Sequence, residues 1–199
     1  YPIVMGWQWG GGWLAELGFS DFAGSTLVHS TGGAAALAGA MIIGPRLGRF
    51  TKSGAPAPLK PFAASSIPLV TIGVFILWLG WFGFNGGSQL AMGTAVDAIA
   101  VSTIFMNTFL AGAGGVVGAA IITRLHFGKT DVVQMLNGCI GGLVAITAEP
   151  LAPAPFEAIL IGAVGGLIVV YGTKLLFSLQ IDDVVGAIPA HLFAGIWGT

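Results

Sequence analysis

Residues 21–29, Asp-Phe-Ala-Gly-Ser-Thr-Leu-Val-His, open a long run of apolar and small residues that decides the fold. His29 lies inside this run, and His191 lies inside a second apolar, glycine-rich run that starts near residue 184. If both runs cross a membrane, each imidazole lies near its middle. An ionisable side chain at that depth is costly and by default marks a functional site. The two histidines are therefore the first candidates for function.

The composition is that of a membrane protein. Apolar residues make up 55% of the 199 residues and charged residues only 8%, whereas soluble domains are about a quarter charged. The net charge of −1 provides no basic surface for nucleic acid. With a single cysteine, the chain has neither an internal disulfide nor a thiolate metal cluster. Because the sequence starts without Met and stops inside an apolar run, we expect it to be an internal fragment of a longer protein.

The apolar residues fall into six segments, most of which approach the roughly 20 residues that a spanning helix needs. Asp21 is a plausible N-cap for the first segment, and a glycine-rich link, residues 85–93, separates the second from the third. Pairs of small residues four apart within the segments indicate close helix packing. We expect the segments at about residues 22–43, 62–84, 98–125, 132–147, 156–179 and from 184 onward.

The basic residues define an orientation. All seven Lys and Arg lie on alternate connections, hence on one side of the membrane, and the positive-inside rule places that side in the cytoplasm. The first, third and fifth segments then run inward and the sixth runs outward. The residues are Arg46, Arg49, Lys52 and Lys60 after the first segment, Arg124 and Lys129 after the third, and Lys174 near the end of the fifth.

This orientation brings the two histidines to a similar depth. His29 follows Asp21 by eight residues and His191 follows Asp183 by eight. Eight residues of helix span roughly 12 Å, so each histidine would lie roughly 12 Å from the membrane face at which its own segment enters, and the two faces are opposite. Two neutral imidazoles that meet can share one N–H···N bond and keep one donor and one acceptor for a small polar passenger. Burial disfavours their charged forms. The alternative is two independent histidines, each satisfied locally.

Other chemistries find little support in the sequence. A metal site needs three or four ligands, and the chain offers no third histidine within a segment, so we expect no metal. A Gly-x-Ser-x-Gly elbow and a P-loop are both absent from the sequence. We therefore expect a protein without a cofactor that is not an enzyme.

Four stretches in this order and spacing resemble the ammonium transporter/methylammonium permease/Rhesus family, specifically its bacterial ammonium transporter branch. The resemblance implies an all-α polytopic membrane protein with eleven helices, inverted repeats of five helices each, and three subunits with one pore apiece. Residues 1–199 would be a partial transporter domain, from the end of helix four to the start of helix ten, with about six transmembrane helices. The stretches are residues 21–29, 80–88, 137–147 and 182–199.

The resemblance also assigns roles to individual residues. His29 and His191 match the paired pore histidines, and Phe84 matches a gate phenylalanine. Trp9 and Ser88 match the site that recruits ammonium. Asp21 matches a carboxylate below that site, which we assign to capping and to the local field, and Trp81 is expected to line the pore.

From the residues alone, Phe84 could equally be a packing residue and Ser88 a helix-end serine. The sequence departs from the common family pattern at Ser25, where glycine is usual, and at Glu149-Pro150, where Gly-Cys is frequent.

The function implied is ammonium/ammonia transport in a cell membrane, plasma or bacterial inner, by a lipid-embedded homotrimer. NH4+ would be recruited outside and NH3 conducted past the histidines, with or without the proton. A PII-type protein is an expected regulator of the full-length protein. Three alternatives stay open: an ammonium-sensing domain of a signalling protein, a Rhesus-like gas channel, and a membrane-embedded enzyme.

Overall fold

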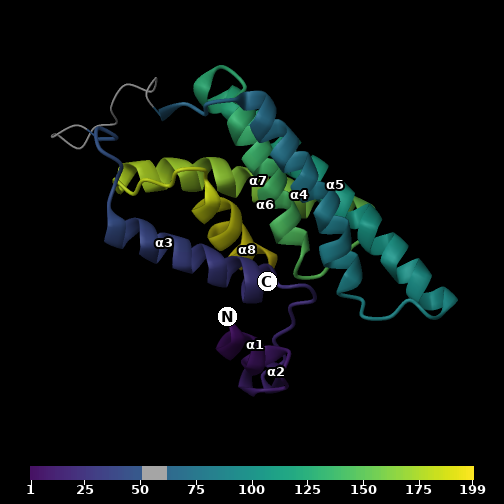
Figure 1. Ribbon diagram of the computed structural model, residues 1–199. Helices are drawn as coiled ribbons and strands as arrows, with labels where there is room; N and C mark the ends of the chain where they lie inside the picture. Colours follow the sequence, from purple (N-terminus) through teal and green to yellow (C-terminus); the bar gives the residue numbers. More distant parts are fainter. Residues whose placement is uncertain (51–61) are drawn as a thin grey trace.

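The computed structural model describes residues 1–50 and 62–199, and its regular elements are helical (Figure 1). Part of the predicted loop 44–61, including Lys52 and Lys60, lies outside the described residues. The elements are α1 (Pro2–Gln8), α2 (Trp13–Glu16), η1 (Ser25–Ser30), α3 (Thr31–Ile43), α4 (Ile67–Gly87), α5 (Ala95–Phe127), α6 (Val132–Ile146), α7 (Pro155–Ser178), η3 (Ile188–Phe193) and α8 (Ala194–Gly198).

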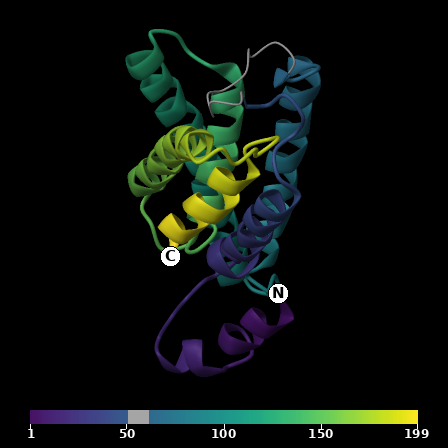
Figure 2. The same cartoon turned by 90° about the vertical axis from the view of Figure 1, so that its left-hand side faces the viewer.

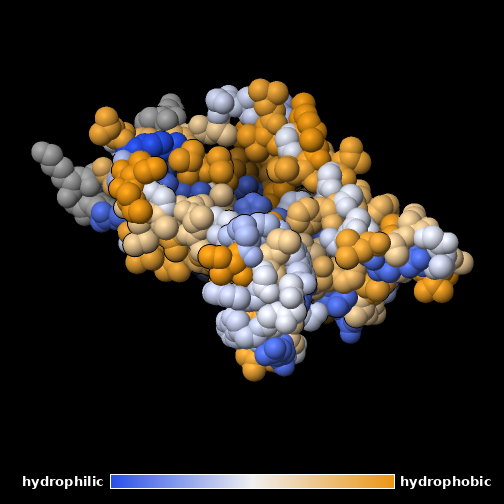
Figure 3. All heavy atoms as spheres, turned by 60° about the horizontal axis from the view of Figure 1, so that its bottom comes forward, coloured by the Kyte–Doolittle hydropathy of each residue, from blue (hydrophilic) through white to orange (hydrophobic). Residues whose placement is uncertain are grey.

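The helices have the length and composition of membrane spans. Four stretches in the described part of the chain are long and apolar enough to cross a membrane: Ser25–Ile43, Ile67–Gly87, Ala95–Phe127 and Pro155–Ser178. The shorter α6 is also apolar. Apolar side chains cover much of the face drawn in Figure 3, as lipid contact requires. The predicted all-α polytopic membrane fold is confirmed.

The centre of the molecule is a bundle of α5, α6 and α7, whose backbones lie very close to one another. A Cβ added to any of the predicted small-residue positions would overlap an atom of a neighbouring helix. These glycines therefore act as packing contacts, as predicted. They are Gly114 and Gly118 on α5, Gly138 and Gly142 on α6, and Gly162 and Gly166 on α7.

The boundaries of α4 correct a prediction. This helix starts at Ile67 rather than residue 62, and it continues through Gly87 where a glycine-rich link was expected. The glycines do not end the helix because they serve packing: a Cβ at Gly86 would overlap the ring of Phe105. Asn85 is fully buried and donates to Thr108 (3.0 Å), which holds this last turn against α5.

The first and sixth segments are not uniform α-helices. Each begins with a turn of π-helix, η1 or η3, and continues as the α-helix α3 or α8. The C-terminal segment, yellow in Figures 1 and 2, lies between α3 and α7, and η1 packs against both η3 and α8. Single-turn π-bulges in proteins are frequent at functional sites, and each of these two contains one of the candidate histidines.

Candidate functional site

The turn that leads to His29 is organised by a buried carboxylate. Asp21 is 1% exposed and accepts four backbone N–H bonds of 2.8–3.0 Å, from residues 24–27. Gly24 makes this tight turn possible with a φ of +109°, a region that side chains rarely adopt. The helix starts at Ser25 with Gly24 at its N-cap, rather than at residue 22 with Asp21 as N-cap, so the predicted position is corrected. Asp21 still caps the helix through its side chain, because its carboxylate binds the first backbone N–H groups.

The turn that leads to His191 is capped in the same way, by the carboxylate of an aspartate. Asp183 accepts backbone N–H bonds from residues 186–188 at 2.7–3.1 Å, and a longer one from Val185 at 3.4 Å. Gly186 has a φ of +80°. Both turns thus follow the pattern Asp-x-x-Gly-x-x-x-x-His. The equal Asp–His spacing was recognised from the sequence, but the shared glycine, which would have identified the turn, was missed.

The two imidazoles meet between these turns. Their Nδ1 atoms lie 3.2 Å apart, and the ring centroids are 5.2 Å apart with an interplanar angle of 27°. One Nδ1 carries the shared hydrogen, which leaves one Nε2 as an acceptor and the other as a donor. Nε2 of His29 is buried and has no hydrogen-bond partner among the described residues. The geometry is that of the predicted pair rather than of two independent histidines.

Glycines allow the two helices to cross at this level. A Cβ at Gly33 would overlap the backbone of Leu192, and a Cβ at Gly195 would overlap Ser25 and Ser30. Each of these glycines lies four residues beyond its own histidine, and each faces the other segment. The backbones can therefore approach closely enough for the histidine side chains to touch.

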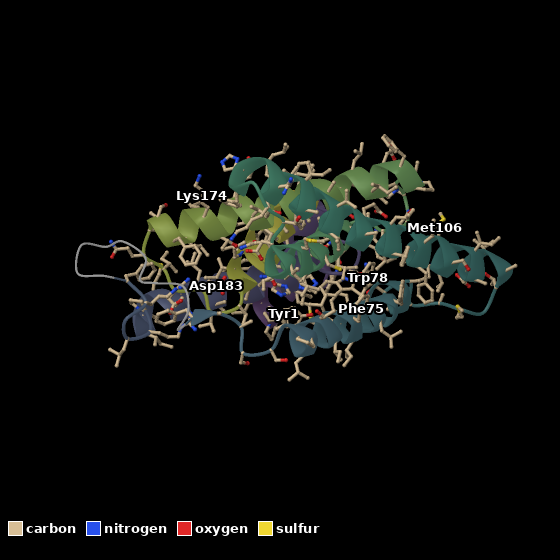
Figure 4. The ribbon with its side chains drawn as sticks, turned by 90° about the horizontal axis from the view of Figure 1, so that it is seen from above. Tyr1, Phe75, Trp78, Met106, Lys174 and Asp183 are labelled. Atoms are coloured by element: carbon tan, nitrogen blue, oxygen red, sulfur yellow. The ribbon has the colours of Figure 1, made fainter. Side chains whose placement is uncertain are left out.

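Two aromatic side chains of α4 cover the histidine pair. The indole of Trp81 stacks on His29 with centroids 4.9 Å apart and an angle of 17°, and Phe84 lies 5.4 Å from the same imidazole. Phe84 is 39% exposed. Trp78, one turn earlier, turns to the core and stacks on Phe109 at 5.4 Å, next to Phe75 (Figure 4). The structure thus brings Trp81 and Phe84 to the site predicted for them.

The two residues predicted to recruit ammonium each make a hydrogen bond of their own. Trp9 donates its indole N–H to the carbonyl of Asp21 (2.8 Å), which attaches its ring to the capped turn, and the residue is 39% exposed. Ser88 follows α4 as its C-cap and donates its hydroxyl to the carbonyl of Phe84 (2.8 Å). Neither of these two bonds joins one residue to the other.

Below the histidines, a groove follows α3. A hollow of about 240 Å³ is lined by both imidazoles together with small residues of α3. A second hollow of about 280 Å³ shares Ala36 with the first and ends at Arg46 and Asp182. The histidine pair therefore opens on one side into a mainly apolar groove. The first hollow is lined by Val28, His29, Gly32, Gly33, Ala36, Ala187 and His191.

Comparison with known proteins identifies the family. The sequence model described as Ammonium Transporter Family matches residues 1–199. The chain belongs to this family. It is 45% identical to ammonium transporter Amt2 of Archaeoglobus fulgidus over 208 aligned residues, which cover 100% of the chain and 43% of that protein. It is 36% identical to ammonium transporter 3 of Dictyostelium discoideum, covering 99% of the chain and 46% of that protein.

Solved structures of the ammonium transporter family share the fold. A sensor Amt protein superposes with a TM-score of 0.91 at 37% identity, covering 100% of this chain and 49% of that one. Candida albicans Mep2 superposes with a TM-score of 0.85 at 32% identity, covering 98% of this chain and 41% of that one. The chain thus spans less than half the length of these relatives.

Sequence reasoning missed a buried polar network beside the histidine pair. Trp81 donates its indole N–H to the hydroxyl of Thr147 (2.9 Å), and Thr147 lies 3.2 Å from the side-chain oxygen of Asn85. Asn85 and Thr147 are fully buried, as is Thr108. Their positions on α4, on α5 and immediately after α6 give no sequence pattern, although an Asn or Thr inside an apolar span was a signal worth following.

The ion pair at the end of the groove was also missed. Arg46 binds Asp182 through Nε (2.7 Å) and Nη2 (2.8 Å), and its backbone N–H donates to the same carboxylate (3.0 Å). These hydrogen bonds lower the pKa of Asp182. Arg49 approaches Asp182 at 3.3 Å and packs its guanidinium on Phe177 at 4.4 Å. The residues that follow α3 and the turn that precedes η3, both predicted on the cytoplasmic side of the membrane, therefore lie together.

The two departures from the family pattern have local explanations. The hydroxyl of Ser25 is buried and donates to the carbonyl of Val144 (2.8 Å) or Gly195 (3.1 Å), so it ties η1 to its neighbours. Glu149 accepts the backbone N–H groups of Leu151 (3.3 Å) and Ala152 (3.2 Å) and thereby closes its own exposed turn.

Proposed function

We propose that this chain forms part of the pore of an ammonium transporter, in which NH3 passes the His29–His191 pair. The observation that carries the proposal is the 3.2 Å contact between the two Nδ1 atoms, at the junction of the aromatic cover and the apolar groove. A neutral pair of imidazoles offers hydrogen bonds to a small polar molecule without adding a charge to an apolar passage. The residues that line the first hollow provide no carboxylate or hydroxyl side chain for an ion such as K+.

Recruitment of NH4+ is assigned to Trp9 and Ser88. The partly exposed indole face of Trp9 attracts a cation by about 0.5–2 kcal/mol. Because the hydroxyl hydrogen of Ser88 is engaged by the carbonyl of Phe84, its oxygen lone pairs are free to accept from the ion. Asp21 acts through its cap and its field, since its carboxylate is occupied by backbone N–H groups.

Passage then requires loss of a proton and movement of Phe84. Phe84 lies between the outer end of α4 and His29, so its ring closes the way to the imidazoles until it rotates. Nε2 of His29, which has no hydrogen-bond partner in the described part of the chain, provides the next hydrogen-bonding position for NH3. Whether the proton crosses together with NH3 is a separate question. An electrical recording answers it, because net transfer of the proton produces a current and transfer of NH3 alone does not.

Several properties of the complete protein belong to the same proposal. The chain would cover the end of helix four through the start of helix ten. The complete protein would be a homotrimer in the plasma or bacterial inner membrane, surrounded by lipid, and open to regulation by a PII-type protein. It would have no enzymatic activity.

The test is flux through a full-length transporter that contains this chain, reconstituted in vesicles. His29→Ala combined with His191→Ala should reduce ammonium flux at least tenfold or abolish its selectivity over K+. Thr173→Val is a matched control because the hydroxyl of Thr173 donates to its own helix, at Val169. Unchanged flux and selectivity in the double variant would refute the role of the pair.

A sensor is the second candidate, favoured by the likeness to a sensor Amt protein with a TM-score of 0.91. The same site would then bind ammonium and transmit its occupancy to another domain. Binding without flux in the vesicle assay would support this alternative, whereas saturable flux supports the transporter.

A further inference from the structure

We propose that Thr147 is a positioning residue for the histidine pair, because its hydroxyl fixes the indole on which His29 is stacked. The inference rests on the proposed function, since it concerns the same pair. Thr147 lies immediately after α6 and is fully buried. It has no direct role with the passenger and acts through Trp81.

The first step is the hydrogen bond between the two side chains. Trp81 Nε1 donates to Thr147 Oγ1 at 2.9 Å, and Trp81 is 6% exposed. An indole has one N–H and no conventional acceptor, so this bond satisfies its only polar group and fixes the direction in which its N–H edge points. The hydroxyl hydrogen of Thr147 can go to the carbonyl of Leu143 (2.7 Å) or to Asn85 (3.2 Å). The oxygen of Thr147 is therefore oriented as an acceptor towards Trp81.

The second step is the contact from the indole to the imidazole. The planes of Trp81 and His29 differ by only 17°, whereas His29 meets His191 edge to edge through the 3.2 Å contact of their Nδ1 atoms. His29 is thus held by an indole on its face and by an imidazole at its edge. A rotated indole would no longer lie parallel to His29, and the Nδ1–Nδ1 contact would lose its support on one side.

The third step is the backbone of the same residue. The carbonyl of Thr147 accepts the N–H of Ala23 (3.0 Å), and the carbonyl of Ala148 accepts that of Phe22 (2.7 Å). These bonds attach the chain just before η1, which carries His29. Thr147 therefore holds both partners of the stack, the indole through its side chain and the imidazole through the backbone that precedes its helix.

The experiment uses ammonium flux through a full-length transporter containing this chain, in vesicles. Thr147→Val keeps the shape and removes the acceptor, and we expect maximal flux to fall at least tenfold. The half-saturating ammonium concentration should stay within twofold, because recruitment at Trp9 is untouched. Thr147→Ser restores the hydroxyl and should stay within twofold of the wild type in both values. Thr173→Val, which removes a hydroxyl bound within its own helix, should change neither.

A double variant separates positioning from general packing. Trp81→Phe removes the N–H donor and should reproduce the loss of flux, which also provides a test if Thr147→Val does not fold. In the Trp81→Phe background, Thr147→Val should have no further effect. Wild-type flux in either single variant, or an equal additional loss in the double variant, would overturn the inference. Failure of the proposed function is recognised separately, because removal of both histidines would then leave flux and selectivity intact.

Discussion

Asp21 and Asp183 occupy equivalent places in two oppositely directed segments. Each carboxylate binds the backbone N–H groups of the following turn, and each precedes a glycine of positive φ by three residues and a histidine by eight. The two imidazoles reach the same level because two copies of one turn start from opposite ends.

Substitution of the capping carboxylate should destabilise the protein. In Asp21→Asn, one oxygen that accepts backbone N–H groups is replaced by an NH2 group that cannot accept. We expect a loss of about 1–3 kcal/mol in the free energy of unfolding, measured by thermal or denaturant unfolding in detergent.

The control for this cap is Glu149→Gln, an equally conservative change at an exposed carboxylate with two backbone partners. Its effect should stay within about 0.5 kcal/mol. Equal effects of the two substitutions would contradict the assignment of Asp21 as a structural cap.

The close approach of the two histidine helices depends on Gly33. Because a Cβ there would overlap Leu192, Gly33→Ala should force the segments apart at a cost of about 1–3 kcal/mol. Ammonium flux should fall at least tenfold as the imidazoles separate. Gly39→Ala on the same helix is the matched control, since a Cβ there meets nothing within 4 Å. A Gly33→Ala variant with wild-type flux would show that the crossing tolerates a wider spacing.

The Arg46–Asp182 pair should make stability depend on pH in the acid range. Hydrogen bonds from Arg46 lower the folded-state pKa of Asp182, while an unfolded aspartate titrates near about 3.9. The stabilisation is therefore complete above that value and is lost as the pH falls through the folded-state pKa. The Asp182 side chain is 2% exposed and that of Arg46 is 39% exposed.

Asp182→Asn should cost about 1.5–3 kcal/mol at pH 7, and this cost should shrink progressively as the pH falls below about 3.9. The measurement is the unfolding temperature of both proteins from about pH 7 down to about pH 2, which lies well below the unfolded-state pKa. A difference between the two proteins that stays constant over this range would contradict a stabilising role for the charge of Asp182.

The sequence predicted the features that composition and periodicity determine. Apolar runs and the placement of Lys and Arg were sufficient for the spans, and the equal Asp–His spacing was sufficient to expect a meeting of His29 and His191. Trp81 was expected near the pair only from the family resemblance, and the polar residues that hold its indole in place were not predicted. Thr147 and Asn85 come from separate positions on the chain, and only tertiary packing makes them neighbours of Trp81 and of each other.

The end of α4 was also not predictable from the sequence alone. A run of glycines after Asn85 is typical of a link, yet α4 continues through it because Gly86 fits against Phe105 and Asn85 bonds to Thr108. The π-helical turns were also unexpected, since the periodicity of a short apolar run does not distinguish them from an α-helix.

The most direct test of the central claim is an experimental structure of a full-length transporter containing this chain, at a resolution that shows both imidazoles. The account predicts Nδ1 atoms close to 3.2 Å apart, with Trp81 parallel to His29 and a groove leading away along α3. Imidazoles that face lipid, or that are separated by packed side chains with no passage between them, would contradict it.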